Sequence, residues 1–136
     1  MKMTQSINRP EPPASALSEP YWAAAAEGRL VLQTCAACGT LRHYPRLLCD
    51  RCYSGEVTWT TASGDGLVHS WTVAHHPFHA AFAAELPYTL VTVTLAEGPR
   101  ALGRWRGGTP AIDQPAVGHF ESRPGGSLEL VFEPRE

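Results

Sequence analysis

The stretch of sequence that decides the fold is CAACGTLRHYPRLLCDRC, residues 35–52. It holds two cysteine pairs, Cys35 with Cys38 and Cys49 with Cys52, and two residues separate the members of each pair. This spacing lets both thiolates of a pair converge on one ion, and two pairs supply the four ligands of a tetrahedral site. We therefore predict a zinc ribbon with these four cysteines as the metal ligands.

The cysteine spacing also admits other interpretations. Two redox-active Cys-x-x-Cys pairs would need a βαβ context, which the sequence does not indicate. Rubredoxin-type iron uses similar loops, so the spacing alone leaves zinc and iron both open. A catalytic zinc keeps one open position, whereas all four cysteines of the chain are ligands here. The metal is therefore expected to be structural and to replace a core that so small a segment cannot build.

The composition limits the kind of partner. The chain has 136 residues, which suits one domain or two small modules. Its net charge is −2, and Lys2 is the only lysine among 11 basic residues. Proteins that bind nucleic acid normally show a basic excess, so nucleic acid is not an expected partner. The preference for arginine reflects either coding bias or bidentate recognition of phosphate or carboxylate.

Signals for export or membrane insertion are not evident in the sequence. No apolar run approaches the roughly 20 residues that span a bilayer, so no membrane association is expected. The polar N-terminus lacks the apolar segment of a signal peptide. We expect a cytoplasmic protein, in which cysteines are metal ligands more often than disulfides.

The sequence before the cysteines predicts a tail and one short helix. Residues 1–17 contain three prolines and little apolar mass, which is typical of a flexible tail. Ser18 is placed to cap a helix over residues 19–27, and Gly28 is placed to end it. Short strands are expected at 30–33 and 56–60, and the helix and the zinc ribbon together occupy 18–60.

The remaining residues, 61–136, are strand-like almost to the end of the chain. Val91 and Val93 alternate with threonines, which predicts a half-buried strand. Turn signals, such as Gly98 with its following proline and residues 124–126, separate the strands. Five strands with no long helix between them predict a small antiparallel barrel of the OB type. The expected strands are 67–74, 88–95, 101–105, 116–122 and 128–132.

Seven short motifs follow one another along residues 18–136. They are YW at 21–22, EGRL at 27–30, CAACG at 35–39, YPR at 44–46, CDRC at 49–52, GDGLVHSWT at 64–72 and ELPY at 85–88. In this order they resemble the DUF35 family, which comprises zinc-ribbon and OB-fold proteins associated with acyl-CoA metabolism. The loop 105–114 is glycine-rich, where members of that family often carry a longer hydrophobic stretch.

The resemblance implies a mainly β fold with a short N-terminal helix, a rubredoxin-like zinc ribbon and a C-terminal five-stranded OB-fold. It also implies a small partner subunit of thiolase-like enzymes. Some members of the family serve acyl-CoA hydratases or aldolases that shorten steroid side chains. In such assemblies the partner supplies the catalytic residues, while the family member bridges subunits or helps to hold the acyl-CoA.

Five residues are candidates for contact with that acyl-CoA. Guanidinium groups bind phosphates well, and coenzyme A carries several phosphates. Arg42 and Arg46 lie within the ribbon, and Arg104 lies on a predicted strand, where the alternative for each is a solvated surface position. Trp71 either packs in the core or contacts the ligand. His75 begins a loop that is expected to face a ligand, a partner or solvent.

That loop contains three histidines, His75, His76 and His79. A second metal site there would lack a carboxylate or a cysteine at useful spacing. A histidine acid or base titrates near neutral pH, but the sequence names no partner for one. Phe78 and Phe82 are expected to pack on the barrel.

Three functions follow from these observations. The expected one is an accessory subunit of an acyl-CoA-processing complex, paired with a thiolase-fold thiolase or aldolase, because the sequence shows no nucleophile–base motif. The alternative is a small stand-alone acyl-CoA enzyme that uses residues 75–79. A nucleic-acid-binding module is a third, since both ribbons and OB barrels bind nucleic acids, but it lacks the required cluster of cations.

Overall fold

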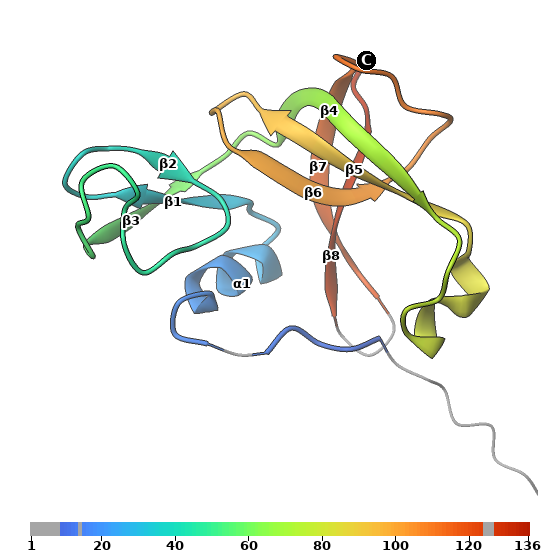
Figure 1. Ribbon diagram of the computed structural model, residues 1–136, viewed down its shortest axis with the longest axis horizontal. Helices are drawn as coiled ribbons and strands as arrows, with labels where there is room; N and C mark the ends of the chain where they lie inside the picture. Colours follow the sequence, from blue (N-terminus) through green and yellow to red (C-terminus); the bar gives the residue numbers. More distant parts are fainter. Residues whose placement is uncertain (1–8, 14, 124–126) are drawn as a thin grey trace, which may run out of the picture.

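The computed structural model describes residues 9–13, 15–123 and 127–136. Figure 1 shows a small three-stranded sheet beside a barrel, with one helix packed along the first strand of the sheet. The turn predicted at residues 124–126 and most of the predicted tail lie outside the described residues. No helix of the described residues is long and apolar enough to cross a membrane.

The single α-helix, α1, spans Glu19–Ala26. Ser18 occupies the N-cap as predicted, but its side chain does not cap the helix, because its hydroxyl lies 2.8 Å from that of Ser15. The helix stops before Gly28, whose φ of 79° is the left-handed conformation predicted there. Tyr21 is buried on the inner face of the helix and anchors it to the body of the molecule.

The three-stranded sheet forms the base of the ribbon. Strand β1 (Val31–Cys35) lies in the centre and pairs antiparallel with β2 (Leu41–Arg42) and β3 (Val57–Thr61). The strands β1 and β3 were predicted, with small shifts in their bounds. Strand β2 was not predicted, because two residues are too few to show a periodic pattern.

The barrel consists of the five strands predicted from the sequence. They close in the order β4-β5-β6-β8-β7, so the mainly β fold with a C-terminal OB-type barrel is confirmed. Val91 and Val93 point into the barrel and are fully buried, as expected. The strands are β4 (Asp65–Ala74), β5 (Tyr88–Leu95), β6 (Arg100–Trp105), β7 (Pro115–Ser122) and β8 (Leu128–Pro134).

Two features of the barrel region differ from expectation. Strands β6 and β8 run parallel, with Trp105 opposite Phe132, so this one pair departs from the antiparallel barrel that the sequence predicted. A closed ring with an odd number of strands cannot alternate in direction all the way round, and one parallel pair is therefore required. In addition, the loop between β4 and β5 contains a short 3₁₀ helix, η1 (Ala80–Glu85), which the sequence did not indicate.

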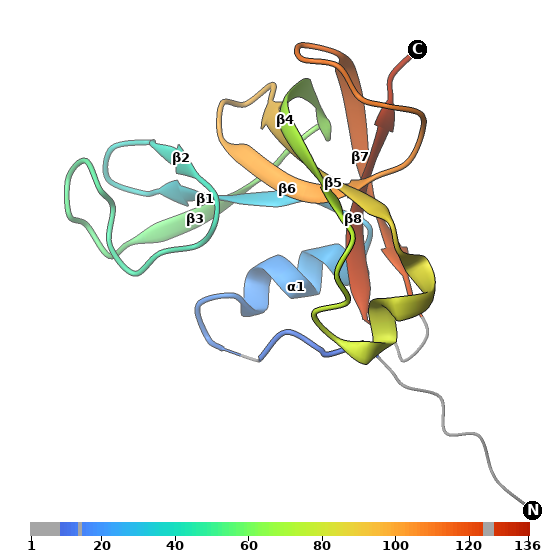
Figure 2. The ribbon, with the colours of Figure 1, turned by 45° about the vertical axis from the view of Figure 1, so that its right-hand side comes forward.

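One hydrophobic core runs through both parts of the molecule. Inside the barrel, Phe132 is fully buried and sits against Gly103 and Gly118, where a side chain larger than hydrogen would collide with its ring. The core continues into α1 through Tyr21 and into β1 through Leu32. The base of the ribbon is therefore fixed to the barrel, while the cysteine loops project away from it (Figure 2).

Candidate metal centre

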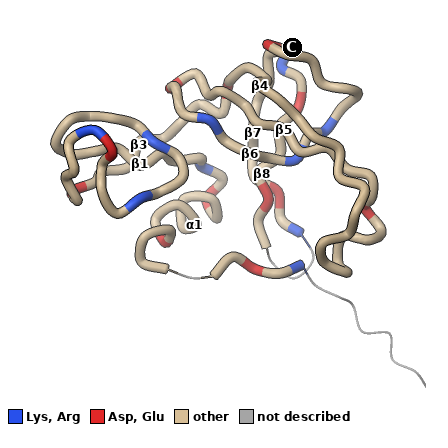
Figure 3. The backbone as a smooth tube through the Cα atoms, in the orientation of Figure 1, with Lys and Arg blue, Asp and Glu red and all other residues tan. Residues whose placement is uncertain are grey.

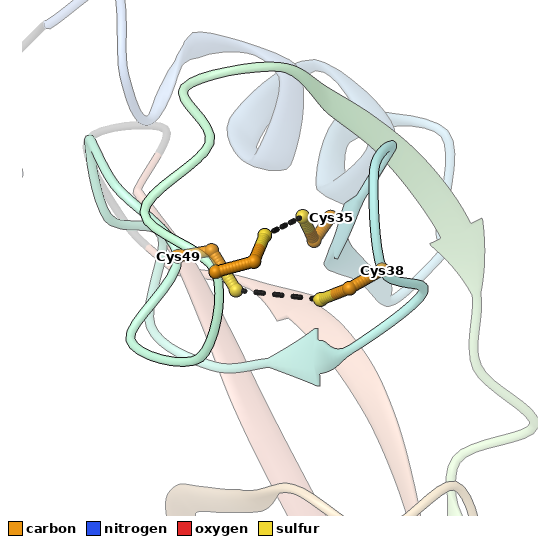
Figure 4. A group of neighbouring side chains, drawn as sticks. Cys35, Cys38 and Cys49 are labelled. Atoms are coloured by element: carbon orange, nitrogen blue, oxygen red, sulfur yellow. Dashed lines mark hydrogen bonds between the residues drawn. The ribbon is translucent and has the colours of Figure 1, made fainter.

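The four cysteine sulfurs lie together at the projecting end of the ribbon. All four Sγ atoms are within 4.8 Å of one another, and the shortest separations are 3.5 Å between Cys35 and Cys52 and 3.6 Å between Cys38 and Cys49. Figure 4 shows Cys35, Cys38 and Cys49 pointing into the space between two loops. Four thiolates about 2.3 Å from a tetrahedral zinc lie about 3.8 Å apart, so the arrangement fits such an ion.

Two loops of the same design hold the sulfurs, knuckle 1 (residues 35–40) and knuckle 2 (residues 49–54). In knuckle 1, the amide of Gly39 donates to the carbonyl of Cys35 at 2.9 Å. In knuckle 2, the amide of Tyr53 donates to the carbonyl of Cys49 at 3.0 Å. Both loops are therefore closed by a bond from the residue that follows the second cysteine of the pair.

The electrostatics of the cluster favour a cation. A hydrogen bond from the Cys38 amide lowers the pKa of the Cys35 thiol. For Cys52, the Ser54 amide acts in the same direction, but the Cys35 sulfur and burial outweigh it and raise the pKa to about 12. Four thiols so close together cannot all ionise against their mutual repulsion, whereas a divalent ion among them would stabilise every thiolate.

The donor set makes this a site for a structural metal. Cys35 and Cys49 are buried, while Cys38 and Cys52 face outward. Four cysteines complete a tetrahedral coordination sphere and leave no position for a substrate. Within the part of the chain that the structure describes, these cysteines form the only group of three or more histidine, cysteine or acidic side chains that could share an ion.

The two candidate arginines of the ribbon occupy different environments. Arg42 is buried, and its Nε donates to the side-chain oxygen of Gln33 at 2.5 Å. The same oxygen accepts the backbone amide of Arg46 at 2.8 Å, so Gln33 joins β1, β2 and the following loop. The Arg42 side chain therefore packs inside the ribbon, whereas the Arg46 side chain is exposed.

The candidates on β4 and the loop after it lie elsewhere. Trp71 is 37% exposed and His75 is exposed, so neither belongs to the core. The Nδ1 of His79 accepts the amide of Ala81 at 3.1 Å and caps η1. Phe78 is 82% exposed and does not pack on the barrel as expected. The end of β4 and η1 lie across the barrel from the ribbon (Figure 1), so the structure does not bring these candidates to the cysteines.

Arg104 lies among carboxylates. Its guanidinium is 3.0 Å from Glu85 and 3.5 Å from Glu129, and it stacks 4.1 Å from the ring centroid of Tyr88. Only 14% of its side chain is exposed. The positive charge of Arg104 is therefore offset by two carboxylates in an ion-pair network.

The same network contains a residue that the sequence did not single out. Arg9 bridges Glu85 and Glu129, and its guanidinium lies 4.8 Å from the ring centroid of Phe82. Arg123 also binds Glu129, at 2.7 Å. No local pattern marks Arg9 as a partner of residues so distant in the chain. Figure 3 shows acidic and basic positions interspersed over the molecule rather than gathered in a basic stripe.

A hollow of about 580 Å³ lies where the N-terminal segment, α1, the ribbon and the outer face of the barrel meet. Trp22, Tyr44 and Leu102 are among its walls, and Arg104 and Glu129 lie at its polar side. Mostly apolar walls with a few polar groups are typical of sites for small molecules or for protruding partner side chains.

Comparisons with known protein families agree with the two parts of this fold. The model of the rubredoxin-like zinc ribbon domain of ChsH2 matches residues 22–58, and the model of the ChsH2 C-terminal OB-fold domain matches residues 59–133. The chain belongs to the ChsH2 family of DUF35 proteins. The resemblance stated from the sequence motifs is thereby confirmed, including the rubredoxin-like character of the ribbon.

Two solved structures are similar to this ChsH2-family chain. It is 39% identical to a chain of the structure called Ltp2-ChsH2(DUF35) aldolase, with a TM-score of 0.80 over 91% of this chain and 98% of that one. A DUF35 protein of unknown function from Sulfolobus solfataricus superposes with a TM-score of 0.61 at 12% identity, over 88% of this chain and 86% of that one. The latter likeness concerns the fold alone.

A curated relative carries a different name. The chain is 47% identical over 94 residues to a protein of Thermomonospora curvata called probable enoyl-CoA hydratase alpha subunit. The match covers 68% of this chain but only 28% of that protein. The hydratase subunit is therefore much longer than the region it shares with this chain.

Proposed function

We propose that the chain is a non-catalytic partner subunit of an acyl-CoA-processing enzyme and that its partner is a thiolase-fold thiolase or aldolase. The observation that carries the proposal is the likeness to the ChsH2 chain of an aldolase assembly over nearly the full length of both chains. The name of the Thermomonospora curvata relative supports an acyl-CoA substrate. Acyl groups from steroid side chains are the substrates that the family resemblance suggests.

The chemistry of the site supports an assisting role. Four cysteines leave a bound zinc no open position, so the metal stabilises the loops and does not activate a substrate. The remaining candidates, which include Arg46, His75 and Arg104, lie in separate parts of the structure or are engaged by carboxylates. The chemical step therefore belongs to the partner, while this chain contributes a rigid surface. The hollow beside α1 is where we would look for contact with the acyl-CoA.

Co-expression tests this proposal. The tagged chain is produced with a candidate thiolase-fold enzyme from the same organism, and the complex is detected by size-exclusion chromatography with light scattering. We expect a stable hetero-oligomer that turns over an acyl-CoA, and no turnover by this chain alone. Elemental analysis should find one zinc ion per chain. If elemental analysis finds iron instead, the structural metal of the proposal is iron and not zinc.

Three results would count against it. A chain that assembles with no thiolase, aldolase or hydratase is not such a subunit. Turnover of an acyl-CoA by the purified chain, lost in His75→Ala, would favour the stand-alone enzyme. Binding of single-stranded DNA at physiological salt would favour the nucleic-acid module.

A further inference from the structure

The two knuckles differ at one equivalent position. The residue after the second cysteine is Gly39 in knuckle 1 and Tyr53 in knuckle 2, and both have a left-handed backbone, with φ of 78° and 63°. Their amides make the equivalent hydrogen bond to the first cysteine of the pair, at 2.9 Å and 3.0 Å. Glycine adopts this conformation freely, whereas a bulky side chain is strained in it. Knuckle 1 thus shows that the loop itself does not need a tyrosine.

The Tyr53 side chain has no polar or aromatic partner among the described residues. Its side chain is 77% exposed. Among the described residues it makes no side-chain hydrogen bond and no contact with another aromatic ring. A strained residue that persists although the local structure would accept glycine indicates a role outside the folded chain.

Two leucines just before knuckle 2 are also exposed. Leu47 is 76% exposed and Leu48 is 56% exposed. Both run alongside the end of knuckle 2, since a Cβ placed on Gly55 would lie 3.7 Å from the Leu47 carbonyl oxygen and 3.8 Å from the Leu48 side chain. Three large apolar side chains are therefore exposed within the seven residues 47–53, at and just before one metal-braced loop, and such a concentration is typical of an interaction surface.

The charges around these three residues indicate what the surface would meet. Arg46 and Arg51 are exposed, and within the described residues neither forms an ion pair. Asp50 is the single acidic residue between them. Tyrosine and arginine are the side chains most enriched at the energetic centres of protein interfaces. An apolar surface that carries carboxylates complements this arrangement in polarity and charge.

We propose that this surface, the knuckle-2 patch (Arg46, Leu47, Leu48, Arg51 and Tyr53), is where the partner subunit docks. The inference rests on the function proposed above. Tyr53 and the leucines fill an apolar pocket of the partner, and the two arginines face carboxylates at its rim. The metal is required because it holds knuckle 2 in the one conformation that presents Tyr53.

The decisive variant is Tyr53→Gly, which copies knuckle 1 into knuckle 2. Because glycine relieves the backbone strain, we expect an unchanged or higher Tm and an unchanged metal content. The affinity for the thiolase-fold subunit used in the co-expression test should fall at least tenfold by calorimetry. The matched control is Phe78→Ala, which removes an equally exposed aromatic ring from the far side of the barrel and should alter Kd less than twofold.

Two further variants separate the apolar and the charged parts of the patch. Leu48→Ser should also weaken binding to the partner at least tenfold without a loss of metal. This variant replaces Tyr53→Gly as the test if Tyr53→Gly does not retain the metal. Arg51→Ala should slow association and reduce the dependence of the association rate on salt, because rim charges act mainly on the encounter of the two proteins.

The outcomes distinguish the two proposals. If the wild-type chain forms the complex and both Tyr53→Gly and Leu48→Ser bind within twofold of it, the patch is not the docking surface, although the proposed function stands. If the wild-type chain forms no complex, the proposed function fails and the inference fails with it. Variants that retain the partner but lose binding of 3′,5′-ADP would assign the patch to a nucleotide instead and overturn the docking proposal.

Discussion

The ribbon and the barrel are both built mainly from antiparallel strand pairs, but they are stabilised in different ways. The barrel closes on itself and buries residues such as Val91 and Phe132 completely. The ribbon has only three strands, one of them of two residues, and its projecting end is organised around four sulfurs. The stability of the barrel thus derives from buried apolar surface, and that of the ribbon end from a bound metal.

The contrast is not complete, because the two parts share a core. Leu30 and Leu32 at the base of the ribbon belong to the same buried cluster as the barrel residues. The base of the ribbon should therefore remain folded whenever the barrel does. Loss of the metal should therefore unfold mainly the knuckles, and any surface that the knuckles form should be lost with them.

Removal of the metal should produce the largest effect. After chelation, or in Cys49→Ala, we expect the knuckles to unfold and the barrel to remain folded. The free energy lost is that of metal binding, which for structural zinc is on the order of 10–16 kcal/mol. Hydrogen exchange measured by mass spectrometry should show fast exchange for residues 35–54 and continued protection in β5.

The chelated protein provides its own control, because added zinc should restore protection in the knuckles, whereas Cys49→Ala should not respond. An apo-protein that keeps full thermal stability and full protection of the knuckles would show that the metal is dispensable. The ribbon would then resemble the barrel in how it is stabilised.

The converse change overpacks the barrel and leaves the metal site intact. A Cβ on Gly103 would lie 2.8 Å from the Phe132 ring and 2.8 Å from the Leu130 carbonyl oxygen. Neither neighbour can move freely, so Gly103→Ala should lower the free energy of unfolding by about 3 kcal/mol. Urea denaturation measures this loss, and elemental analysis should find the zinc content unchanged.

Gly108→Ala is the matched control, since a Cβ at that position meets no atom within 4 Å. Its effect should stay within about 0.5 kcal/mol, as for most surface substitutions. Equal losses in the two variants would mean that the contact with Phe132 does not limit the packing of the barrel.

The features that were predicted from the sequence are those with local signals. The cysteine ligands are separated by two residues within each pair, so their convergence follows from neighbouring positions. The strand β5 begins at Tyr88 and ends at Leu95 as predicted, because alternation and flanking turns define it. The predicted number of five strands already requires one parallel pair in a closed barrel, but that conclusion was not drawn from the sequence.

The features that were missed depend on distant parts of the chain. Arg9 binds Glu85 and Glu129, which are 76 and 120 residues away. The burial of Arg42 depends on Gln33, which comes from another strand. The five candidate ligand contacts were chosen by residue type, because the local sequence does not show how far apart the fold places them; they stay predictions.

A smaller effect is expected from pH at the junction of ribbon and helix. The His43 ring lies 4.0 Å from Tyr44 and 5.4 Å from Tyr21, and burial lowers its pKa from 6.5 to about 4. Between these values the unfolded chain binds the proton and the folded chain does not. Stability should therefore fall as the pH decreases from about 6.5 to 4, by about 2 kcal/mol.

His43→Phe should remove that part of the pH dependence, because phenylalanine does not titrate. Urea unfolding at pH 7 and pH 5, with zinc in excess, compares the variant with the wild type at each pH. His76→Gln, at an exposed position, is the control and should follow the wild type. If the free energy of unfolding of His43→Phe falls between pH 7 and pH 5 as much as that of the wild type, His43 is not the source of the pH dependence.

The smallest effect concerns where the N-terminal segment is attached. The side chain of Arg9 is 10% exposed and bridges two carboxylates of the barrel region, whereas Arg29 is 46% exposed and pairs with Glu27 near the end of α1. Arg9→Ala should cost about 1 kcal/mol and leave Glu85 and Glu129 less well compensated. Arg29→Ala should cost less than about 0.5 kcal/mol, because exposed ion pairs contribute little.

Hydrogen exchange locates the Arg9→Ala effect as well as measuring it. Faster exchange confined to η1 and β8, with unchanged knuckles, would make the N-terminal segment part of the barrel and independent of the metal. Faster exchange in the knuckles would instead link the segment to the ribbon, in contradiction to the contacts of Arg9. Because chelation acts on the opposite end of the molecule, the double perturbation should be additive within about 0.5 kcal/mol if the two regions are stabilised separately.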